Sequence, residues 1–136
     1  MPIKDTKRWF EIAVPAPTPK NVSVQIGCHM EEFAEMLTAL GETTLARAVD
    51  RVADGYKAAM YASPAIGRRE LLDALADQIV TATGIGHMLG MDIVGALGEV
   101  NRSNFSKFVD GKPVFKEHGK IAKGPGYSEP DLSPFI

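Results

Sequence analysis

Six carboxylates fall into two groups of three, and each group lies within about two turns of a predicted helix. The groups are Glu31, Glu32 and Glu35, and then Glu70, Asp73 and Asp77. At about 100° per residue, each group gathers on one side of its helix, opposite the apolar residues. Clustered carboxylate oxygens suit hard cations such as Mg²⁺ or Mn²⁺. If the two groups face each other, they therefore form a site for such an ion.

The alternative is an ordinary solvated surface, because an amphipathic helix usually turns its charges toward water. However, no Lys or Arg lies within four residues of Glu31, Glu32 or Glu35. Like charges at this spacing repel, so something other than a nearby side chain is expected to neutralise the group. The chain has no cysteine pair and no Glu-x-x-His motif, which argues against a zinc site and a di-iron site.

The composition predicts one soluble globular domain. The chain has 136 residues, 45% of them hydrophobic, and a formal net charge of −2. The balanced charge argues against a nucleic-acid polymer as partner. The single cysteine, Cys28, excludes an internal disulfide framework. No membrane span and no signal peptide are apparent, so we expect a cytoplasmic protein.

The helices that must position the acids are predicted from apolar spacing and from capping residues. The expected helices span residues 4–12, Asn21 or Ser23 to about Leu40, Glu42 to about Ala62, about Ile66 to Leu89, and Asp92 to about Val109. Three prolines make residues 15–21 an extended connector, and Ser63-Pro64 ends the third helix. The predicted fold is all-α, a bundle of four to five helices with a helical core over about 22–110.

Residues 111–136 form a different kind of segment, rich in Gly, Pro and Lys. Its prolines forbid a long helix, so we expect an irregular C-terminal extension that packs on the bundle rather than a second domain. A small hairpin is possible, in which Val114-Phe115 faces Ile121 around His118-Gly119.

Opposite the acids, two apolar faces are the candidates for the core. They are Ile26, Met30, Phe33, Leu37 and Leu40 in the second helix, and Leu71, Leu72, Leu75, Ile79 and Ala82 in the fourth.

The ordered set of motifs resembles the MazG-like superfamily of all-α nucleoside triphosphate pyrophosphohydrolases, which includes phosphoribosyl-ATP pyrophosphohydrolase. Glu31-Glu32-Phe33-Ala34-Glu35 is similar to the EExxE motif of that superfamily, and Asp73-Ala74-Leu75-Ala76-Asp77 lies where its ExxD motif is expected. Residues 101–108 are similar to its Asn-x-x-Lys-Phe segment. The tail motifs after residue 110 are similar to those of a subgroup common in bacteria and phages. The resemblance covers roughly residues 25–132.

The resemblance implies a Mg²⁺-dependent enzyme, with Mn²⁺ as a possible substitute, that cleaves a (d)NTP into (d)NMP and pyrophosphate. Metal ligands would be Glu32, Glu35, Asp73 and Asp77. Asp73 enters this set because Ala74 replaces the Glu of the ExxD motif. Glu31 or Glu35 would act as the catalytic base, and the residues do not decide between them.

The nucleotide would contact the last helix and the tail. Candidate substrate-binding residues are Asn101, Asn104, Lys107, Lys123 and Tyr127, with Arg102 a weaker candidate. Asn104 and Lys107 share a helix face, which lets one bind ribose or base and the other phosphate. Ordinary surface lysines are the alternative for Lys107 and for the tail lysines. Members of the superfamily are helical dimers or tetramers, so we expect a homodimer or homotetramer.

Two other kinds of function stay open because of Ala74. One is a catalytically weak bundle that binds a nucleotide, for example an alarmone, or a protein partner. The other is a purely structural bundle, for which Mg²⁺ would give no thermal shift. The sequence does not settle base or sugar preference. The expected role is nucleotide metabolism in a bacterium or a phage, by trimming of the nucleotide pool.

Overall fold

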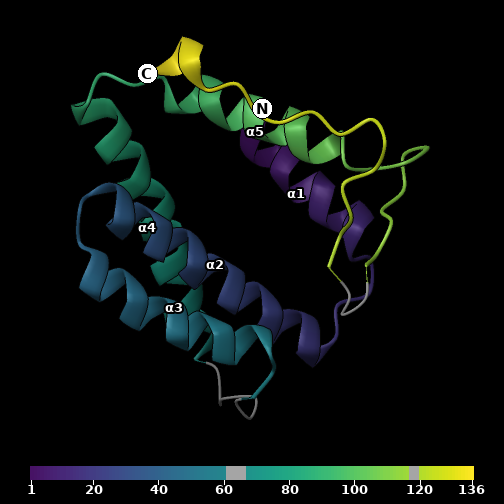
Figure 1. Ribbon diagram of the computed structural model, residues 1–136, viewed down its shortest axis with the longest axis horizontal. Helices are drawn as coiled ribbons and strands as arrows, with labels where there is room; N and C mark the ends of the chain where they lie inside the picture. The colour runs from purple at the N-terminus through teal and green to yellow at the C-terminus, as the bar shows by residue number, and fades with distance from the viewer. Residues whose placement is uncertain (61–66, 117–119) are drawn as a thin grey trace. The chain divides into compact units, whose positions relative to one another are not determined.

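The structure is a computed structural model that describes residues 1–60, 67–116 and 120–136 (Figure 1). These residues form helices and isolated bridges but no extended strand, which confirms the all-α prediction. The elements are α1 (Pro2–Ala13), α2 (Pro19–Ala39), α3 (Thr43–Lys57), α4 (Arg68–Met88), α5 (Ile93–Phe105) and the short 3₁₀ helix η2 (Ser133–Phe135).

The chain divides into two compact units, and each is described separately. One unit is residues 16–68, which contain the α2–α3 pair. The other combines residues 1–15 with 69–136, and therefore holds α1, α4, α5 and the C-terminal extension. The first unit is thus inserted in sequence between two segments of the second.

The start of α2 differs from the prediction. Thr18 is the N-cap, and its hydroxyl accepts a hydrogen bond from the backbone N–H of Asn21 at 3.2 Å. The Asn21 side chain in turn accepts from the Thr18 backbone N–H at 2.8 Å, which completes a capping box. Pro19 occupies the first helical turn, where its missing N–H costs nothing. The extended connector is therefore shorter than predicted.

The α2–α3 hairpin turns at Gly41, whose φ of 85° is the left-handed conformation that glycine favours. The helix α3 ends at Lys57, before the predicted end near Ala62. Its C-terminal turn is closed by backbone bonds from Ala59 to Tyr56 and from Met60 to Gly55, both 3.0 Å. The predicted stop at Ser63-Pro64 and the predicted start of the next helix at Ile66 lie outside the described residues.

Small residues form the contact between α2 and α3. The buried residues of the pair are Gly27, Ala34 and Leu37 on α2 and Ala46, Ala53 and Gly55 on α3. The predicted core residue Phe33 is 48% exposed. The buried face of α2 is thus rotated roughly a quarter-turn from the predicted one, at 100° per residue. Glycine and alanine let the backbones approach closely, and apolar spacing alone does not reveal this.

In the other unit, α1 packs beside α5 (Figure 1). Trp9 stacks on Phe108 with ring centroids 5.6 Å apart, and its indole N–H donates to the backbone oxygen of Asn104 at 3.0 Å. Phe10 meets Trp9 edge-on at 5.1 Å. This aromatic cluster fixes the first helix to the last one.

The helix α5 begins at the cap Asp92, as predicted, whose carboxylate accepts from the backbone N–H of Gly95 at 2.9 Å. It ends at Phe105 rather than near Val109. Asp110 and Gly111 then adopt positive φ values of 52° and 73° in a turn closed by Val109 and Lys112.

The extension contains the predicted pairing. Phe115 and Ile121 form an antiparallel bridge, and the Ala122 N–H donates to the Val114 oxygen at 2.6 Å. The turn predicted at His118-Gly119 lies outside the described residues.

Residues 68–83 of α4 all have exposed side chains, including those of its predicted core face. Leu72 is 69% exposed and Ile79 is 54% exposed.

No single helix in the described part of the chain is long and apolar enough to span a membrane. Only the pair of α4 and α5, which is bent by 117°, meets the length and composition of a membrane span.

Candidate functional site

The acids of α2 begin one turn after Gly27, where α2 and α3 lie very close together. A Cβ added to Gly27 would lie 2.6 Å from the Lys57 Cγ and 2.7 Å from the Ala53 backbone oxygen. Ser23, one turn earlier, donates its hydroxyl hydrogen to the Tyr56 backbone oxygen at 2.7 Å. Because Gly27 has no side chain, the stem of Lys57 passes directly over α2.

Lys57 supplies a positive charge to the first acid group. Its Nζ lies 3.0 Å from the Glu31 Oε2 and 3.9 Å from the Asp54 Oδ1. The hydrogen bond to Glu31 is the main reason that the pKa of Lys57 is raised above its usual range. The Glu31–Lys57 pair is only partly exposed, with side-chain accessibilities of 39% and 29%.

Lys57 was not among the residues predicted from the sequence. The neutralising charge was sought within four residues of the acids, whereas it comes from the neighbouring helix. The close approach at Gly27 was the only available signal, and a glycine in mid-helix does not by itself identify its neighbour.

The other predicted metal ligands are exposed on their helices. Glu32 and Glu35 lie on α2, one and four residues beyond Glu31, and Asp73 and Asp77 lie on α4. The two helices belong to different units, so the convergence of the two groups stays a prediction. Within residues 1–60, 67–116 and 120–136, no three carboxylate, imidazole or thiol groups are gathered closely enough to hold a metal ion. The donor chemistry suits Mg²⁺, but an assembled site would need residues from both groups.

The tail returns to the C-terminal end of α5 and brings several predicted substrate residues together. The Gly124 N–H donates to the Lys107 backbone oxygen at 3.2 Å. A Cβ at Gly124 would lie 2.9 Å from that oxygen, so only glycine fits there without displacement. The Lys123 ammonium lies 4.7 Å from the centre of the Tyr127 ring, a cation–π distance. Lys107, Lys123 and Tyr127 thus belong to one local arrangement.

Asn101 is occupied within the protein. It is 5% exposed, its amide nitrogen donates to the Pro2 oxygen at 2.7 Å, and its amide oxygen accepts from the Thr6 hydroxyl at 2.8 Å. Its side chain therefore holds α1 against α5, a role that the sequence prediction did not include. Asn104 also contributes to this contact, through its backbone oxygen.

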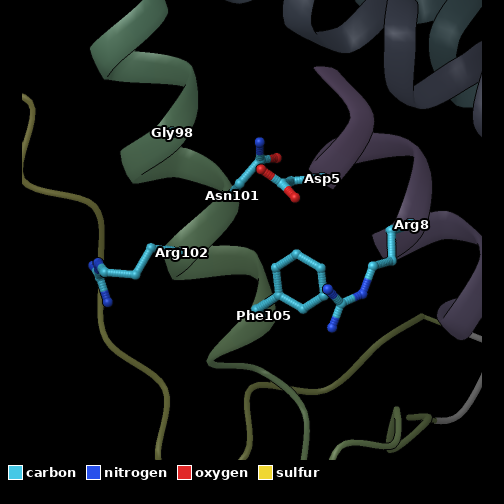
Figure 2. Close-up of a pocket in the computed structure, with 6 residues that line it drawn as sticks. All are labelled: Asp5, Arg8, Gly98, Asn101, Arg102 and Phe105. Atoms are coloured by element: carbon cyan, nitrogen blue, oxygen red, sulfur yellow. The ribbon is translucent and has the colours of Figure 1, made fainter. Parts of the chain in front are cut away.

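Beside Asn101, an open pocket of about 280 Å³ lies between α1 and α5 (Figure 2). It is lined by Asp5, Arg8, Gly98, Asn101, Arg102 and Phe105. Arg8 lies over the Phe105 ring, 5.6 Å from its centre. One carboxylate, Asp5, and two guanidinium groups, Arg8 and Arg102, line this pocket, and Arg102 is also hydrogen-bonded to Glu99.

Comparisons with protein-family models, with curated proteins and with solved structures each found no match. The resemblance to pyrophosphohydrolases therefore depends on the motifs of the sequence, and the activity that it implies is a proposal.

Proposed function

We propose that this protein is a Mg²⁺-dependent nucleoside triphosphate pyrophosphohydrolase. The observation that carries the proposal is the set of exposed carboxylates on α2, Glu32 and Glu35, next to the Glu31–Lys57 ion pair. The ion pair neutralises one acid of the EExxE motif, and Glu32 and Glu35 of the same motif have exposed side chains. Glu32 and Glu35, with Asp73 and Asp77 of α4, would hold Mg²⁺ or Mn²⁺. The bound ion would polarise phosphoryl oxygens and lower the pKa of water.

Glu35 is the better candidate for the base, because Glu31 is already hydrogen-bonded to Lys57. In the proposed reaction, the oxygen of a water molecule attacks the α-phosphorus of the nucleotide. The bond to the bridging oxygen breaks, Glu35 accepts the proton of the water, and pyrophosphate leaves with the bond's electron pair. The products are a nucleoside monophosphate and pyrophosphate.

Lys107, Lys123 and Tyr127 would bind the nucleotide. The tail holds them at one end of α5, where two ammonium groups can attract a polyphosphate. Asn104 lies in the last turn of α5, whereas Lys107 follows the end of the helix, so the two do not share the predicted helix face. Asn104 would contact ribose or base. The proposal includes a homodimer or homotetramer as the working assembly.

The test is a panel of all NTPs and dNTPs, incubated with Mg²⁺, with Mn²⁺ or with a chelator. Monophosphate and pyrophosphate are expected in equal amounts, only when a metal is present. Glu35→Gln should lose about 10²-fold or more in rate, as is usual when an acid–base group is removed. Glu32→Gln and Asp77→Asn should also lose activity, because each removes a ligand charge for Mg²⁺. Glu42→Gln is the matched control, because Glu42 is an exposed acid on the same hairpin and its side chain makes no cap hydrogen bond.

Release of orthophosphate, or full activity in all three site variants, would contradict the proposal. No turnover of any nucleotide, combined with nucleotide binding in calorimetry, would favour the alternative of a binding module. The feature that favours this alternative is Ala74, which stands where the ExxD motif has its Glu.

A further inference from the structure

The last nine residues follow α5 along its whole length. We call residues 128–136 the C-terminal strap; it runs beside α5 in Figure 1, where it is yellow. At the C-terminal end of α5, the Ser128 N–H donates to the Ser106 hydroxyl at 3.0 Å. At the N-terminal end, the Asp92 N–H donates to the Phe135 oxygen at 2.9 Å. The Phe135 ring fills the space that a side chain at Gly95 would need, with ring atoms 2.7 Å from the Cβ position.

Between these two ends, a single ion pair holds the strap. The Arg102 guanidinium donates two hydrogen bonds to the Glu99 carboxylate, at 2.7 and 2.8 Å. Arg102 also donates to the Glu129 backbone oxygen at 2.9 Å, and Glu99 accepts from the Asp131 N–H at 2.9 Å. Figure 2 shows Arg102 extended from α5 toward this segment. Each member of the pair thus binds its partner and one backbone group of the strap.

This geometry removes Arg102 from the set of candidate phosphate ligands. Its guanidinium is committed to Glu99 and to the Glu129 oxygen, and its planar fork matches both acceptors. Glu99 is 18% exposed, so its hydrogen bonds are partly shielded from water. The pair therefore fixes the path of the backbone, whatever the side chains of residues 129 and 131 are.

The fixed strap begins directly after the residues proposed to bind the nucleotide. Tyr127 precedes Ser128, and the Tyr127 N–H donates to the Gly124 oxygen at 3.0 Å. Lys123 lies against the Tyr127 ring. Because no free linker separates Tyr127 from the strap, the position of the strap determines the position of both side chains.

We propose that Glu99 and Arg102 are positioning residues that hold the strap, and through it place Lys123 and Tyr127 to contact a nucleoside polyphosphate. The substrate part of this inference rests on the proposed function, whereas the anchoring part does not. The structure thus divides the residues at this end of the molecule into anchors on α5 and ligands on the tail.

The test compares Glu99→Gln with Glu11→Gln in the full-length protein. Both variants lose one carboxylate from an ion pair, but Glu11 pairs with Lys7 on α1 and does not touch the strap. The first measurement is the rate of limited trypsin cleavage after Lys120 and Lys123. Glu99→Gln should be cleaved faster by about tenfold, because the strap loses its contact with the Glu99 carboxylate. Glu11→Gln should match the wild type.

The second measurement is the kinetics of pyrophosphate release. Glu99→Gln should raise KM by about tenfold and leave kcat within about twofold, because the lost contacts act on binding. Arg102→Lys provides an independent variant if Glu99→Gln fails to fold. Lysine retains the positive charge but cannot form the bidentate contact with Glu99, so the same changes in cleavage rate and KM are expected.

Unchanged cleavage in both anchor variants would overturn the inference. Faster cleavage with an unchanged KM would overturn its substrate part, while the proposed function would stand. No hydrolysis by the wild type would overturn the proposed function and with it the substrate part, and the cleavage rates would still decide the anchoring.

Discussion

At the scale of single residues, the protein uses its charges in two different ways. Lys57 of α3 neutralises Glu31 on α2, and Glu32 and Glu35 on the same helix are exposed. On α5, Glu99 and Arg102 satisfy each other and also bind the backbone of the strap. The first arrangement joins two neighbouring helices, and the second joins a helix to the C-terminal strap.

The lowered pKa of Glu99 should make the stability of the folded protein depend on pH. The hydrogen bonds from Arg102 and from the Asp131 N–H lower the pKa of Glu99 to about 2, from the usual 4.5. A lowered pKa in the folded state stabilises the fold above the ordinary pKa, and this contribution is lost as the pH falls through the folded pKa. We expect the difference in melting temperature between the wild type and Glu99→Gln to be constant above about pH 4.5 and to shrink toward pH 2. A difference that stays constant between pH 2 and pH 5 would contradict this assignment.

At the scale of the elements, the close contact of α2 with α3 depends on Gly27. In Gly27→Ala the new methyl group would lie 2.7 Å from the Ala53 oxygen and 2.8 Å from the Lys57 nitrogen, and neither backbone atom can move easily. Overpacking of this kind costs about 1–3 kcal/mol of unfolding free energy. Denaturant titration of Gly27→Ala should show this loss.

The matched control is Gly84→Ala, in the interior of α4, where an added Cβ meets nothing within 4 Å. It should stabilise the protein by roughly 0.5–1 kcal/mol, because alanine loses less backbone entropy than glycine. Equal denaturation midpoints for Gly27→Ala and the wild type would show that the two helices can separate without cost.

Most of the helical elements could be predicted from the sequence, because apolar spacing and helix-ending glycines are local features. Gly41 and Gly90 follow their helices at positive φ, close to the predicted ends at Leu40 and Leu89. The buried face of α2 could not be predicted, since it depends on contacts with α3 at small residues. The α3 end was missed because Ala59, a non-glycine residue, adopts a positive φ of 52° there. In the candidate site, the exposed acids were predicted, whereas Lys57 and the Glu99–Arg102 anchor come from elements distant in sequence from their partners.

At the scale of the whole molecule, α4 carries a row of exposed apolar residues. Leu71 and Leu75 are each 40% exposed, and Leu72 is 69% exposed. Covering such a row is worth about 25 cal/mol for each Å² of apolar surface removed from water. The proposed homodimer or homotetramer would provide this cover.

A charge placed on this face should therefore weaken the assembly. We expect Leu72→Glu to lower the mass measured by light scattering toward that of one chain. Thr81→Glu places the same charge on the opposite side of α4 and should leave the mass unchanged. A wild-type mass equal to 14.7 kDa would contradict the proposed oligomer.

The contact of α1 with α5 has a consequence for biosynthesis. Thr6 and Asn101 are 95 residues apart, as are Trp9 and Asn104. During translation the first helix leaves the ribosome long before its partner exists, whereas α2 and α3 can pair as soon as both have emerged. The indole of Trp9 therefore stays exposed to water until residues near Asn104 have been synthesised. Its fluorescence should report the final stage of folding, after the central hairpin has formed.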